Sequence, residues 1–410
     1  SEPGMTAKRY LLIVAVVTGA LAAAVVTLCN QADPYGLHAA NRADDPGEVD
    51  ATEPTGAFWR KAFTVRRIMP RTVILGTSRA DAALDSNHPA FSAEDAPVLN
   101  LALGAAEIEQ MRLLLIHANT VSDLRKAVIG LDIEAFLGGG RADFHAAALE
   151  GNPRSEPAWL SRLLVYFSPA ALASAVSQLL APESTLSKPP FETVLKALDG
   201  QRGLIWTTEI NNFYARLAQL FPPAAKAARW NADPRRRAAM QSFRQLLAYA
   251  REHDIELRLF VSPVHARYLE WYRRVGWWPL FQDWKRELVN AIASERPAPA
   301  ANQIVLWDFS GFHSAATETV PALGDLETRM KWYRESSHYS PALGYQILSC
   351  VVAGRSAEGS PLPEARIDGG NIERHLSRLA RDAEAWRAAQ RGEAENVREM
   401  VQYLRRIGRK

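Results

Sequence analysis

The stretch Thr72-Val-Ile-Leu-Gly-Thr-Ser-Arg79 places four residues of strand character directly before a glycine and two hydroxyl residues. A continuous run of this kind favours a strand that is covered on both faces, as in parallel sheets. Further runs with the same character lie at residues 97–101, 127–132, 256–261 and 303–308. Together with residues 72–76, they predict a parallel sheet of five strands.

Helical patterns separate most of these runs. Apolar side chains recur at helical spacing in residues 105–119, 235–253 and 280–293, and another helix is expected from Pro341 onward. Alternating strands and helices predict a doubly wound α/β domain, which we place at residues 69–365. The interval between the third and fourth strands, about 120 residues, is too long for a plain crossover. We therefore expect a mostly helical insertion at residues 138–233, a candidate lid, with helices near residues 159–180 and 191–198.

The N-terminal region contains one long uncharged segment. Residues 11–29 carry no charge and can cross a hydrocarbon core of about 30 Å as a helix. They predict a transmembrane helix at residues 10–29, after a cytoplasmic tail of residues 1–9. A cleaved signal peptide is the alternative, although the run is long for a signal core and no clear cleavage site follows.

The charges around this segment predict its orientation. Lys8 and Arg9 precede it, and a polar, acidic stretch follows it. Because basic residues stay on the cytoplasmic side, the N-terminus is expected inside and the bulk of the chain outside. This corresponds to the inner membrane with a periplasmic domain. Residues 30–68 predict an extracytoplasmic tether between the membrane and the domain.

Composition and motifs exclude several classes of function. A net charge of +3 over 410 residues gives no reason to expect a nucleic-acid partner. Cys29 and Cys350 are not expected to pair. We find no phosphate loop, dinucleotide fingerprint or zinc-ligand spacing, so neither a cofactor nor a metal is predicted. Residues 366–410 predict one C-terminal amphipathic helix with a basic last turn, either a solvated helix end or a contact for anionic lipid or glycan.

Polar residues follow the predicted strands where each strand ends. Ser78 follows the first strand. Asn100 lies at the end of the second strand, and Gly104 follows it. Asp132 ends the third strand, and His265 follows the fourth. In open α/β sheets the ligand crevice lies beyond the carboxyl ends of the strands. These residues are therefore expected to converge on one rim, with His265 either part of the site or a satisfied rim histidine.

Ser78 is the natural nucleophile of this rim, because a serine hydroxyl becomes reactive when a base lies beside it. The candidate base is His338, in the segment Glu335-Ser-Ser-His-Tyr-Ser-Pro341 before a predicted helix. Glu335 could hold the imidazole tautomer and stabilise the imidazolium. The alternatives are a turn serine, a structural histidine and a surface carboxylate.

The combination of a strand, Gly-x-Ser and a late acid-x-x-His resembles the SGNH (GDSL-like) hydrolase superfamily. More narrowly, Gly76-Thr-Ser78 and Glu335-x-x-His338-Tyr339 resemble the membrane-anchored cell-envelope branch with the alginate and cellulose O-acetylation proteins and the D-alanylation protein DltD. The resemblance covers roughly residues 71–136 and 256–350. It implies a flavodoxin-like sheet, a Ser78, His338 and Glu335 triad, and a multispanning membrane-bound O-acyltransferase as partner.

The sequence departs from that family at two places. The acid of the last block is Glu335 where the family has Asp, and the third block lacks its oxyanion-hole Asn because Asp132 ends the stretch Gly130-Leu-Asp132. An ionised carboxylate donates no hydrogen bond. The hole would rest on the backbone N–H groups of Ser78 and Gly104, with the side chain of Arg79 or Asn100 as a further donor. Substrate contacts are predicted for Arg79, Asn100, Asp132, His265 and Tyr339.

These features lead to two main hypotheses. The first is a membrane-anchored extracytoplasmic O-acyltransferase or esterase that modifies a cell-envelope or exported polysaccharide through an acyl-serine intermediate. The second is a non-catalytic scaffold of the same fold that binds a polysaccharide or a membrane synthase. A lipase-like esterase ranks below both, because no long acyl groove is evident. The aromatic residues of segment 271–284 could stack on sugar rings or pack in the core.

Overall fold

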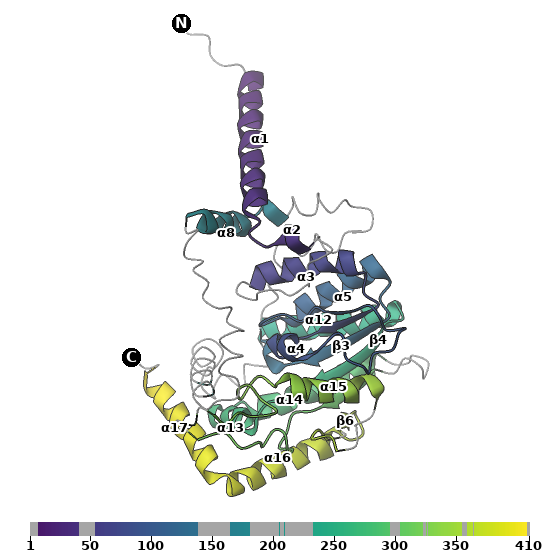
Figure 1. Cartoon of the computed structure of the whole chain (residues 1–410), viewed down its shortest axis with the longest axis vertical. Coiled ribbons are helices and arrows are strands. Elements are labelled where there is room, and N and C mark those ends of the chain that lie inside the picture. Colours follow the sequence, from purple (N-terminus) through teal and green to yellow (C-terminus); the bar gives the residue numbers. More distant parts are fainter. Residues whose placement is uncertain are drawn as a thin grey trace.

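The computed structural model describes residues 7–40, 54–137, 165–180, 205, 209, 233–295, 304–322, 325, 327–354, 359–363 and 365–407. One long helix, α1 (Ala7–Ala32), projects from an α/β domain, and the C-terminal helices lie at the opposite end of the molecule (Figure 1). Most of the predicted insertion, including the helix expected at residues 191–198, lies outside the described residues.

A mostly parallel sheet forms the centre of the domain. Its strands are β1 (Thr72–Leu75), β2 (Val98–Asn100), β3 (Lys126–Leu131), β4 (Glu256–Val261), β5 (Val305–Asp308) and β6 (Arg366–Ile367). Their order is β2-β1-β3-β4-β5-β6, and β1 to β5 run parallel. The five predicted strands are present, but the strand count of five is wrong. The sixth, β6, pairs antiparallel to β5 and is only two residues long, too short to show any periodicity in the sequence.

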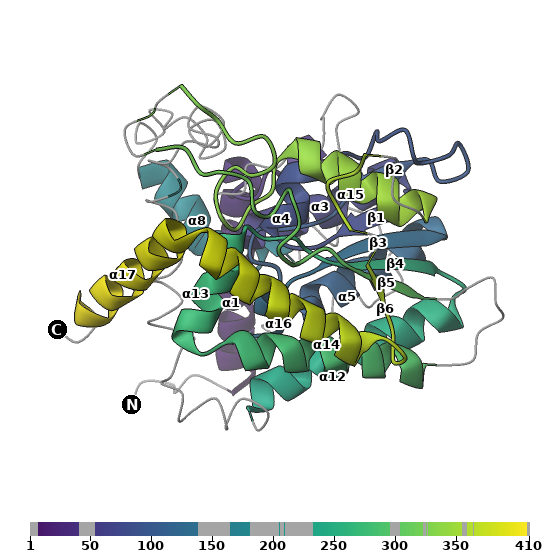
Figure 2. The same ribbon diagram turned by 90° about the horizontal axis from the view of Figure 1, so that it is seen from below.

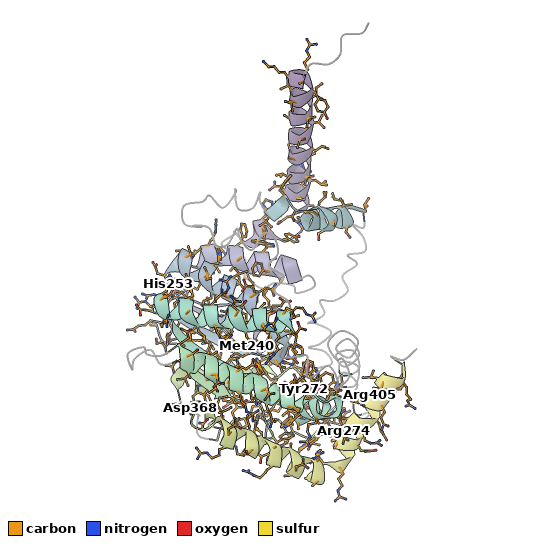
Figure 3. The ribbon with its side chains drawn as sticks, turned by 180° about the vertical axis from the view of Figure 1, so that it is seen from behind. Met240, His253, Tyr272, Arg274, Asp368 and Arg405 are labelled. Carbon is orange, nitrogen blue, oxygen red and sulfur yellow. The ribbon has the colours of Figure 1, made fainter. Side chains whose placement is uncertain are left out.

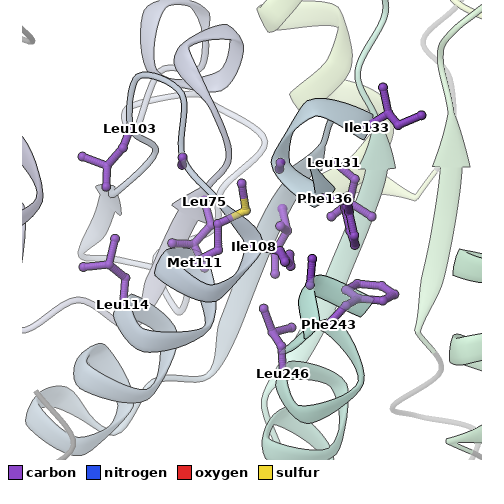
Figure 4. Close-up of a cluster of buried hydrophobic side chains, with 14 of the residues drawn as sticks. Leu75, Leu103, Ile108, Met111, Leu114, Leu131, Ile133, Phe136, Phe243 and Leu246 are labelled. Atoms are coloured by element: carbon purple, nitrogen blue, oxygen red, sulfur yellow. The ribbon is translucent and has the colours of Figure 1, made fainter. Parts of the chain in front are cut away.

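Both faces of the sheet are covered, as the continuous apolar runs predicted. In β1, Val73 and Leu75 belong to one buried cluster and Ile74 to another. In β4, Leu259 and Phe260 divide in the same way. Successive side chains of a strand point to opposite faces, so this division places apolar cores on both sides. Figure 4 shows part of the first core, where side chains from strands β1 and β3 meet those of helices α5 and α12.

Helices cover the two faces unequally. The face of the first core carries α3 (Pro54–Ile68), α5 (Ile108–Ser122), α12 (Pro234–Glu252) and α14 (Trp278–Ser294). The other face carries α4 (Ser78–Ala83) and α15 (Pro341–Ala353). The 3-10 turn η1 (Ile133–Phe136) follows β3. Helix α13 (Ala266–Val275) follows β4 (Figure 2). The architecture is therefore the predicted α/β class with a doubly wound sheet.

The predicted tether, residues 30–68, is wrong in its second half. Helix α3 packs against α5 through Phe58, Trp59 and Phe63, which are almost fully buried. The Lys61 ammonium, also buried, donates to Asp81 and to a backbone carbonyl of the segment after β2. Arg60 and Lys61 interrupt the sequence between Trp59 and Phe63, and this mixture concealed the apolar face of the helix. The acidic residues 41–53 lie outside the described residues.

The C-terminal region forms two helices where one was predicted. Helix α16 (Ile372–Ala389) packs on α14, and α17 (Arg391–Ile407) packs on α13. Gln390 separates them with a backbone conformation outside the helical region. The apolar stripes of the two helices meet different partners, so a straight helix could not bury both. From behind, Arg405 of α17 lies beside Arg274 of α13, and its guanidinium donates to the Arg274 carbonyl at 3.1 Å (Figure 3).

The N-terminal helix α1 is the one helix of the described residues that is long and apolar enough to cross a membrane, and it could equally be a membrane anchor or a signal sequence. Residues Tyr10 to Leu21 of this helix are largely exposed. Its last turns contact α8 (Pro169–Leu180), a helix that lies within the predicted insertion. The short helix α2 (Leu37–Ala40) leads away from this junction.

Candidate active site

The site is built on the sharp turn from β1 into α4. A side chain at Gly76 would bring its Cβ to 2.7 Å from the Ala80 Cβ, so only glycine allows the chain to turn here. Thr77 caps α4, and its hydroxyl accepts from the Arg79 N–H at 3.4 Å. Ser78 is consequently the first helical residue, half-buried at the carboxyl end of the sheet.

Three of the predicted residues form a continuous hydrogen-bonded chain. The Ser78 hydroxyl lies 2.8 Å from the Nε2 atom of His338. The Nδ1 atom of the same imidazole is hydrogen-bonded to the Glu335 carboxylate. Glu335 is buried, whereas 27% of the His338 side chain is exposed. The order hydroxyl, imidazole, carboxylate is the arrangement in which a histidine can take the hydroxyl proton while the carboxylate holds the ring.

The loop that carries His338 is held from both of its ends. Tyr333 and Tyr339 form an isolated antiparallel bridge, and the Arg334 N–H donates to the His338 carbonyl at 3.0 Å. Ser340 then caps α15, its hydroxyl accepting from the Leu343 N–H at 3.4 Å. His338 therefore sits between a closed loop and a capped helix, which restricts where its ring can point.

Close packing of α15 on α4 brings the two halves of the site together. A Cβ added to Gly344 would lie 2.0 Å from the Ala83 carbonyl oxygen. The backbones of the two helices therefore approach as closely as only glycine permits. Ser78 begins α4 and His338 precedes α15, so this contact sets the separation between the hydroxyl and the imidazole.

The Glu335 carboxylate is kept ionised by its surroundings. Burial by itself would raise its pKa, but the His338 side chain, the Ser337 N–H and the Arg79 charge together lower the pKa below its ordinary value. The Ser337 N–H donates to the second carboxylate oxygen at 2.9 Å. An anion at this position favours the proton on Nδ1 of His338, which leaves Nε2 free to accept from Ser78.

Two backbone N–H groups near Ser78 could stabilise an oxyanion. The Ser78 N–H belongs to the first turn of α4, where no intrahelical acceptor exists. Gly104 lies in the turn after β2, and its neighbour Leu103 donates to the Gly76 carbonyl at 3.0 Å, which ties this turn to the Ser78 turn. Among the described residues, no acceptor for the N–H of Ser78 or Gly104 is found. Ala105 holds a left-handed φ of 54°, so the turn has a fixed and uncommon conformation.

Asn100 does not offer its side chain to this site. Its amide nitrogen donates to the carbonyls of Ala80, at 3.2 Å, and Leu84, at 2.9 Å. Its amide oxygen accepts from the Ala102 N–H at 3.0 Å. Both side-chain donors are used on backbone carbonyls, so the predicted role of Asn100 as oxyanion donor or substrate contact is wrong. Its function is to connect the end of β2 with α4.

Arg79 is likewise turned away from the rim. Its guanidinium donates to the Ser337 carbonyl at 2.8 Å and is paired with Asp132 at 2.7 Å and Glu134 at 3.0 Å. Burial would lower its pKa, but the two carboxylates raise it well above the ordinary value. The Thr77 hydroxyl donates to the same Asp132 carboxylate. Arg79 and Asp132 are thus buried positioning residues, and their predicted substrate contacts are wrong.

His265 and Tyr339 are also structural in this arrangement. His265 caps α13, and its Nε2 atom is 2.8 Å from the Glu318 carbonyl oxygen. Burial lowers its pKa to about 4, so the ring is neutral near pH 7. The Tyr339 side chain is fully buried, and burial raises its pKa. The predicted substrate contacts of both residues are therefore wrong, and His265 is the satisfied rim histidine.

Sequence reasoning missed the residues that support the triad. Glu134 accepts from Tyr268 at 2.9 Å and from Tyr272 at 2.7 Å while it pairs with Arg79. The one signal in the sequence is that acidic residues follow β3 while an arginine, Arg79, follows Ser78. The aromatic segment 271–284 is mainly core, since Trp271 and Trp284 are fully buried.

No family model, curated protein or solved structure matches this chain. Within the described residues, no group of three histidine, cysteine or acidic side chains could hold a metal ion. The thiols of Cys29 and Cys350 are both buried there.

Proposed function

We propose that this chain is a membrane-anchored serine acyltransferase or esterase of the SGNH type that acts on a cell-envelope or exported polysaccharide. The observation that carries the proposal is the 2.8 Å contact between the Ser78 hydroxyl and His338, whose other ring nitrogen bonds Glu335. The order β2-β1-β3-β4-β5 is that of flavodoxin-like sheets, which bind ligands at the carboxyl ends of their strands. Ser78 lies at that edge.

The residues support a two-step acyl transfer. The Ser78 oxygen attacks the carbonyl carbon of an acyl ester as Nε2 of His338 takes the hydroxyl proton. The carbonyl oxygen becomes an oxyanion, which the N–H groups of Ser78 and Gly104 stabilise. The bond to the leaving alcohol breaks, and His338 returns its proton to that alcohol. A sugar hydroxyl or water then attacks the acyl-serine, with His338 again as base, and Ser78 is restored.

The position of the anchor favours transfer over free hydrolysis. Lys8 and Arg9 lie in the first turn of α1, before its uncharged stretch, and this charge pattern favours a rim of Ser78 outside the cytoplasm, in the periplasm if the membrane is an inner membrane. No acyl-CoA is available there, so the acyl group must arrive from the membrane. A multispanning membrane-bound O-acyltransferase would supply it, and anchoring keeps Ser78 at a high effective concentration near such a partner.

A non-catalytic scaffold is the second candidate, and the oxyanion site favours it. Asp132, which stands where the resembled family has its donor Asn, is committed to Thr77 and Arg79. Asn100 is committed to backbone carbonyls. The hole consequently has two backbone donors, and the loss of one donor can cost about 10²-fold in rate. According to this second candidate, the same fold binds a glycan or a synthase and catalyses no reaction.

Substitution of Ser78 separates the two candidates. The full chain and its Ser78→Ala and His338→Ala variants are compared for cleavage of a soluble model ester and for O-acylation of the envelope glycan in cells. The enzyme predicts that both variants lose both activities while keeping the circular dichroism of the parent. Unchanged glycan O-acylation in the Ser78→Ala variant would contradict the enzyme, and glycan binding without any turnover would favour the scaffold.

A further inference from the structure

We propose that α8 is an interfacial helix, lying in the plane of the membrane surface where α1 leaves the hydrocarbon. This inference rests on the proposed anchoring of the chain by α1. It assigns a lipid surface as the occupant of an exposed apolar patch, which we define as Phe167, Val176, Leu179 and Leu180.

The composition of α8 is unusual for a helix facing water. None of its twelve residues is charged. The patch residues are strongly exposed, with Leu180 at 81% and Phe167 at 55% of their full accessibility. A water-facing helix normally presents charged or polar residues on its outer face, and contiguous exposed apolar residues mark an interaction site. The patch therefore needs an apolar partner.

The inner face of α8 shows how the helix is attached. Ala171 and Ala175 are fully buried in the same cluster as Cys29 of α1, and Val25 packs against that cluster. Small residues on α8 allow it to approach the last turns of α1 closely. The exposed apolar residues of α8 then lie beside the last turns of α1, whose preceding turns expose apolar residues from Tyr10 to Leu21.

The level of this contact matches a membrane boundary. Counting from Tyr10, about 20 helical residues span a hydrocarbon core of roughly 30 Å, which brings the boundary close to Cys29. Helix α8 meets α1 at this level and lies across it (Figure 1). Amphipathic helices at an interface lie in the plane of the bilayer with their apolar face at the boundary between head groups and acyl chains.

A half-buried carboxylate joins the segments at the junction of the two helices. Asp33, in the turn after α1, accepts from the N–H groups of Leu37 at 2.7 Å and His38 at 3.1 Å. It also accepts from the hydroxyl of Tyr166, just before α8. One side chain thus joins the end of α1, the start of α2 and the start of α8. Such a joint suits a helix that must keep one orientation to the membrane.

The placement of α8 has a consequence for Ser78. In Figures 1 and 2, α8 lies on the same side of the domain as α4 and α13, which follow the carboxyl ends of β1 and β4. Along the direction of α1, α3 lies closer to α8 than α4 and α13 do (Figure 1). An interfacial α8 would therefore turn the α3 end of the domain to the bilayer, and the rim of Ser78 would open sideways, along the membrane surface.

Site-specific fluorescence in vesicles tests this placement. The full chain carries Leu180→Cys, labelled with an environment-sensitive dye, in vesicles of phosphatidylcholine and phosphatidylglycerol. Cys29 and Cys350 are fully buried, and the labelling of the unsubstituted chain gives the background. We expect blue-shifted emission that is quenched by nitroxide lipids labelled near the head group more than by lipids labelled deep in the chain. The exposed Tyr345→Cys on α15 should show neither effect.

Two outcomes would overturn the inference. Emission at position 180 like that in water would show an uncovered patch, and a blue shift without lipid quenching would show a protein partner or a second copy. The same dye at Val17→Cys, an exposed position of α1, shows whether α1 itself enters the bilayer. If position 17 is quenched by deep nitroxides and position 180 is not quenched, α8 alone is wrongly placed. If position 17 is not quenched either, the proposed anchoring fails, and this inference with it.

A variant of the same patch, with the active-site residues unchanged, can be compared with the parent in activity. The paired substitution of Leu179→Lys and Leu180→Lys lies on exposed positions, so folding should be retained. Cleavage of a soluble ester in detergent should equal that of the parent, whereas glycan O-acylation in membranes should fall severalfold. Equal O-acylation by the paired variant and the parent would contradict a positioning role for α8.

Discussion

At the residue scale, the site depends on which nitrogen of His338 carries the proton. Glu335 lies against Nδ1, and the Ser78 hydroxyl lies 2.8 Å from Nε2. Only the tautomer with the proton on Nδ1 lets Nε2 accept from serine. The carboxylate selects that tautomer because it can accept but not donate, and its lowered pKa keeps it ionised near neutral pH. Glu335 is thus the acid of the proposed triad.

Substituting Glu335 tests this selection. The amide of Glu335→Gln can donate to Nδ1, which would place the imidazole proton on Nε2 and block its role as base. We expect the rate of ester cleavage to fall by about 10³-fold or more. Glu335→Asp keeps the charge and should retain at least about tenfold more activity than Gln. Steady-state cleavage rates of a model ester measure both variants. Equal rates for the Gln and Asp variants would contradict a tautomer-selecting carboxylate.

The sequence predicted the triad but not the direction in which the neighbouring side chains point. Ser78, Glu335 and His338 were identified because their residue types follow a strand end and precede a helix. Arg79 and Asn100 occupy equally suitable positions in the sequence, yet their side chains turn inward. Direction depends on partners that are distant along the chain, such as Ser337 for Arg79, and no local pattern encodes it.

At the element scale, the contact between α4 and α15 determines the geometry of the site. Gly344 lies against the Ala83 carbonyl, so these helices cannot separate or gain a side chain without moving Ser78 relative to His338. A residue far from any substrate thereby controls the hydrogen bond at the centre of the site.

Gly344→Ala tests this control. The added Cβ would lie 2.0 Å from the Ala83 oxygen, so α15 must shift. We expect a destabilisation of about 1–3 kcal/mol from overpacking, together with a large loss of ester cleavage in the folded fraction. Urea denaturation and activity of the same sample measure the two effects. Gly392→Ala in α17, where nothing lies within 4 Å of the new Cβ, is the matched control and should lower neither stability nor activity. Full activity in Gly344→Ala would contradict the proposed geometry.

The pairing of α3 with α5 makes stability depend on pH. His117 on α5 is buried with its Nε2 atom 2.8 Å from the Ala62 carbonyl of α3, and burial lowers its pKa to about 4. In the unfolded chain the pKa is about 6.5. Between these values the unfolded state binds more protons, so stability falls as pH drops through 6.5 and continues to fall until about 4.

The expected cost from His117 at pH 5, relative to pH 7.5, is about 2 kcal/mol. Urea denaturation at a series of pH values gives this slope. His117→Gln, whose amide can still donate to the Ala62 carbonyl, should fold at pH 7.5 and lose about one proton from the slope between pH 5 and 6.5. An identical slope in both proteins would show that His117 already titrates normally in the folded state.

At the scale of the whole molecule, α3 belongs to the folded domain rather than to a tether. A chain that begins at residue 54 keeps α3, and one that begins at residue 70 lacks it. The shorter chain exposes the apolar face of α5 that Trp59 and Phe63 cover, and it loses the Lys61 ammonium that joins α4 to the end of β2. We expect the longer chain to unfold cooperatively in urea and the shorter one to aggregate or to lack a cooperative transition. Equal stability of the two would contradict the assignment.

The whole architecture was predictable to the level of its strands. Continuous apolar runs indicated β1 to β5, because parallel strands buried on both faces leave a strong local pattern. Strand β6 and the break at Gln390 left none, since the first is two residues long and the second depends on what each helix packs against. Helix α3 was missed because its aromatic face is interrupted by basic residues, among them Lys61, whose partners lie in α4 and in the segment after β2.

We propose that Ser78 is a nucleophile activated by His338. Treating the full chain with a fluorophosphonate probe, followed by mass spectrometry of the labelled peptide, tests it directly. We expect a covalent adduct on Ser78 that is lost in Ser78→Ala and His338→Ala. The adduct should be kept in Ser349→Ala, because Ser349 lies on α15 away from the triad. An unlabelled parent chain, or labelling that persists in His338→Ala at the parent rate, would contradict it.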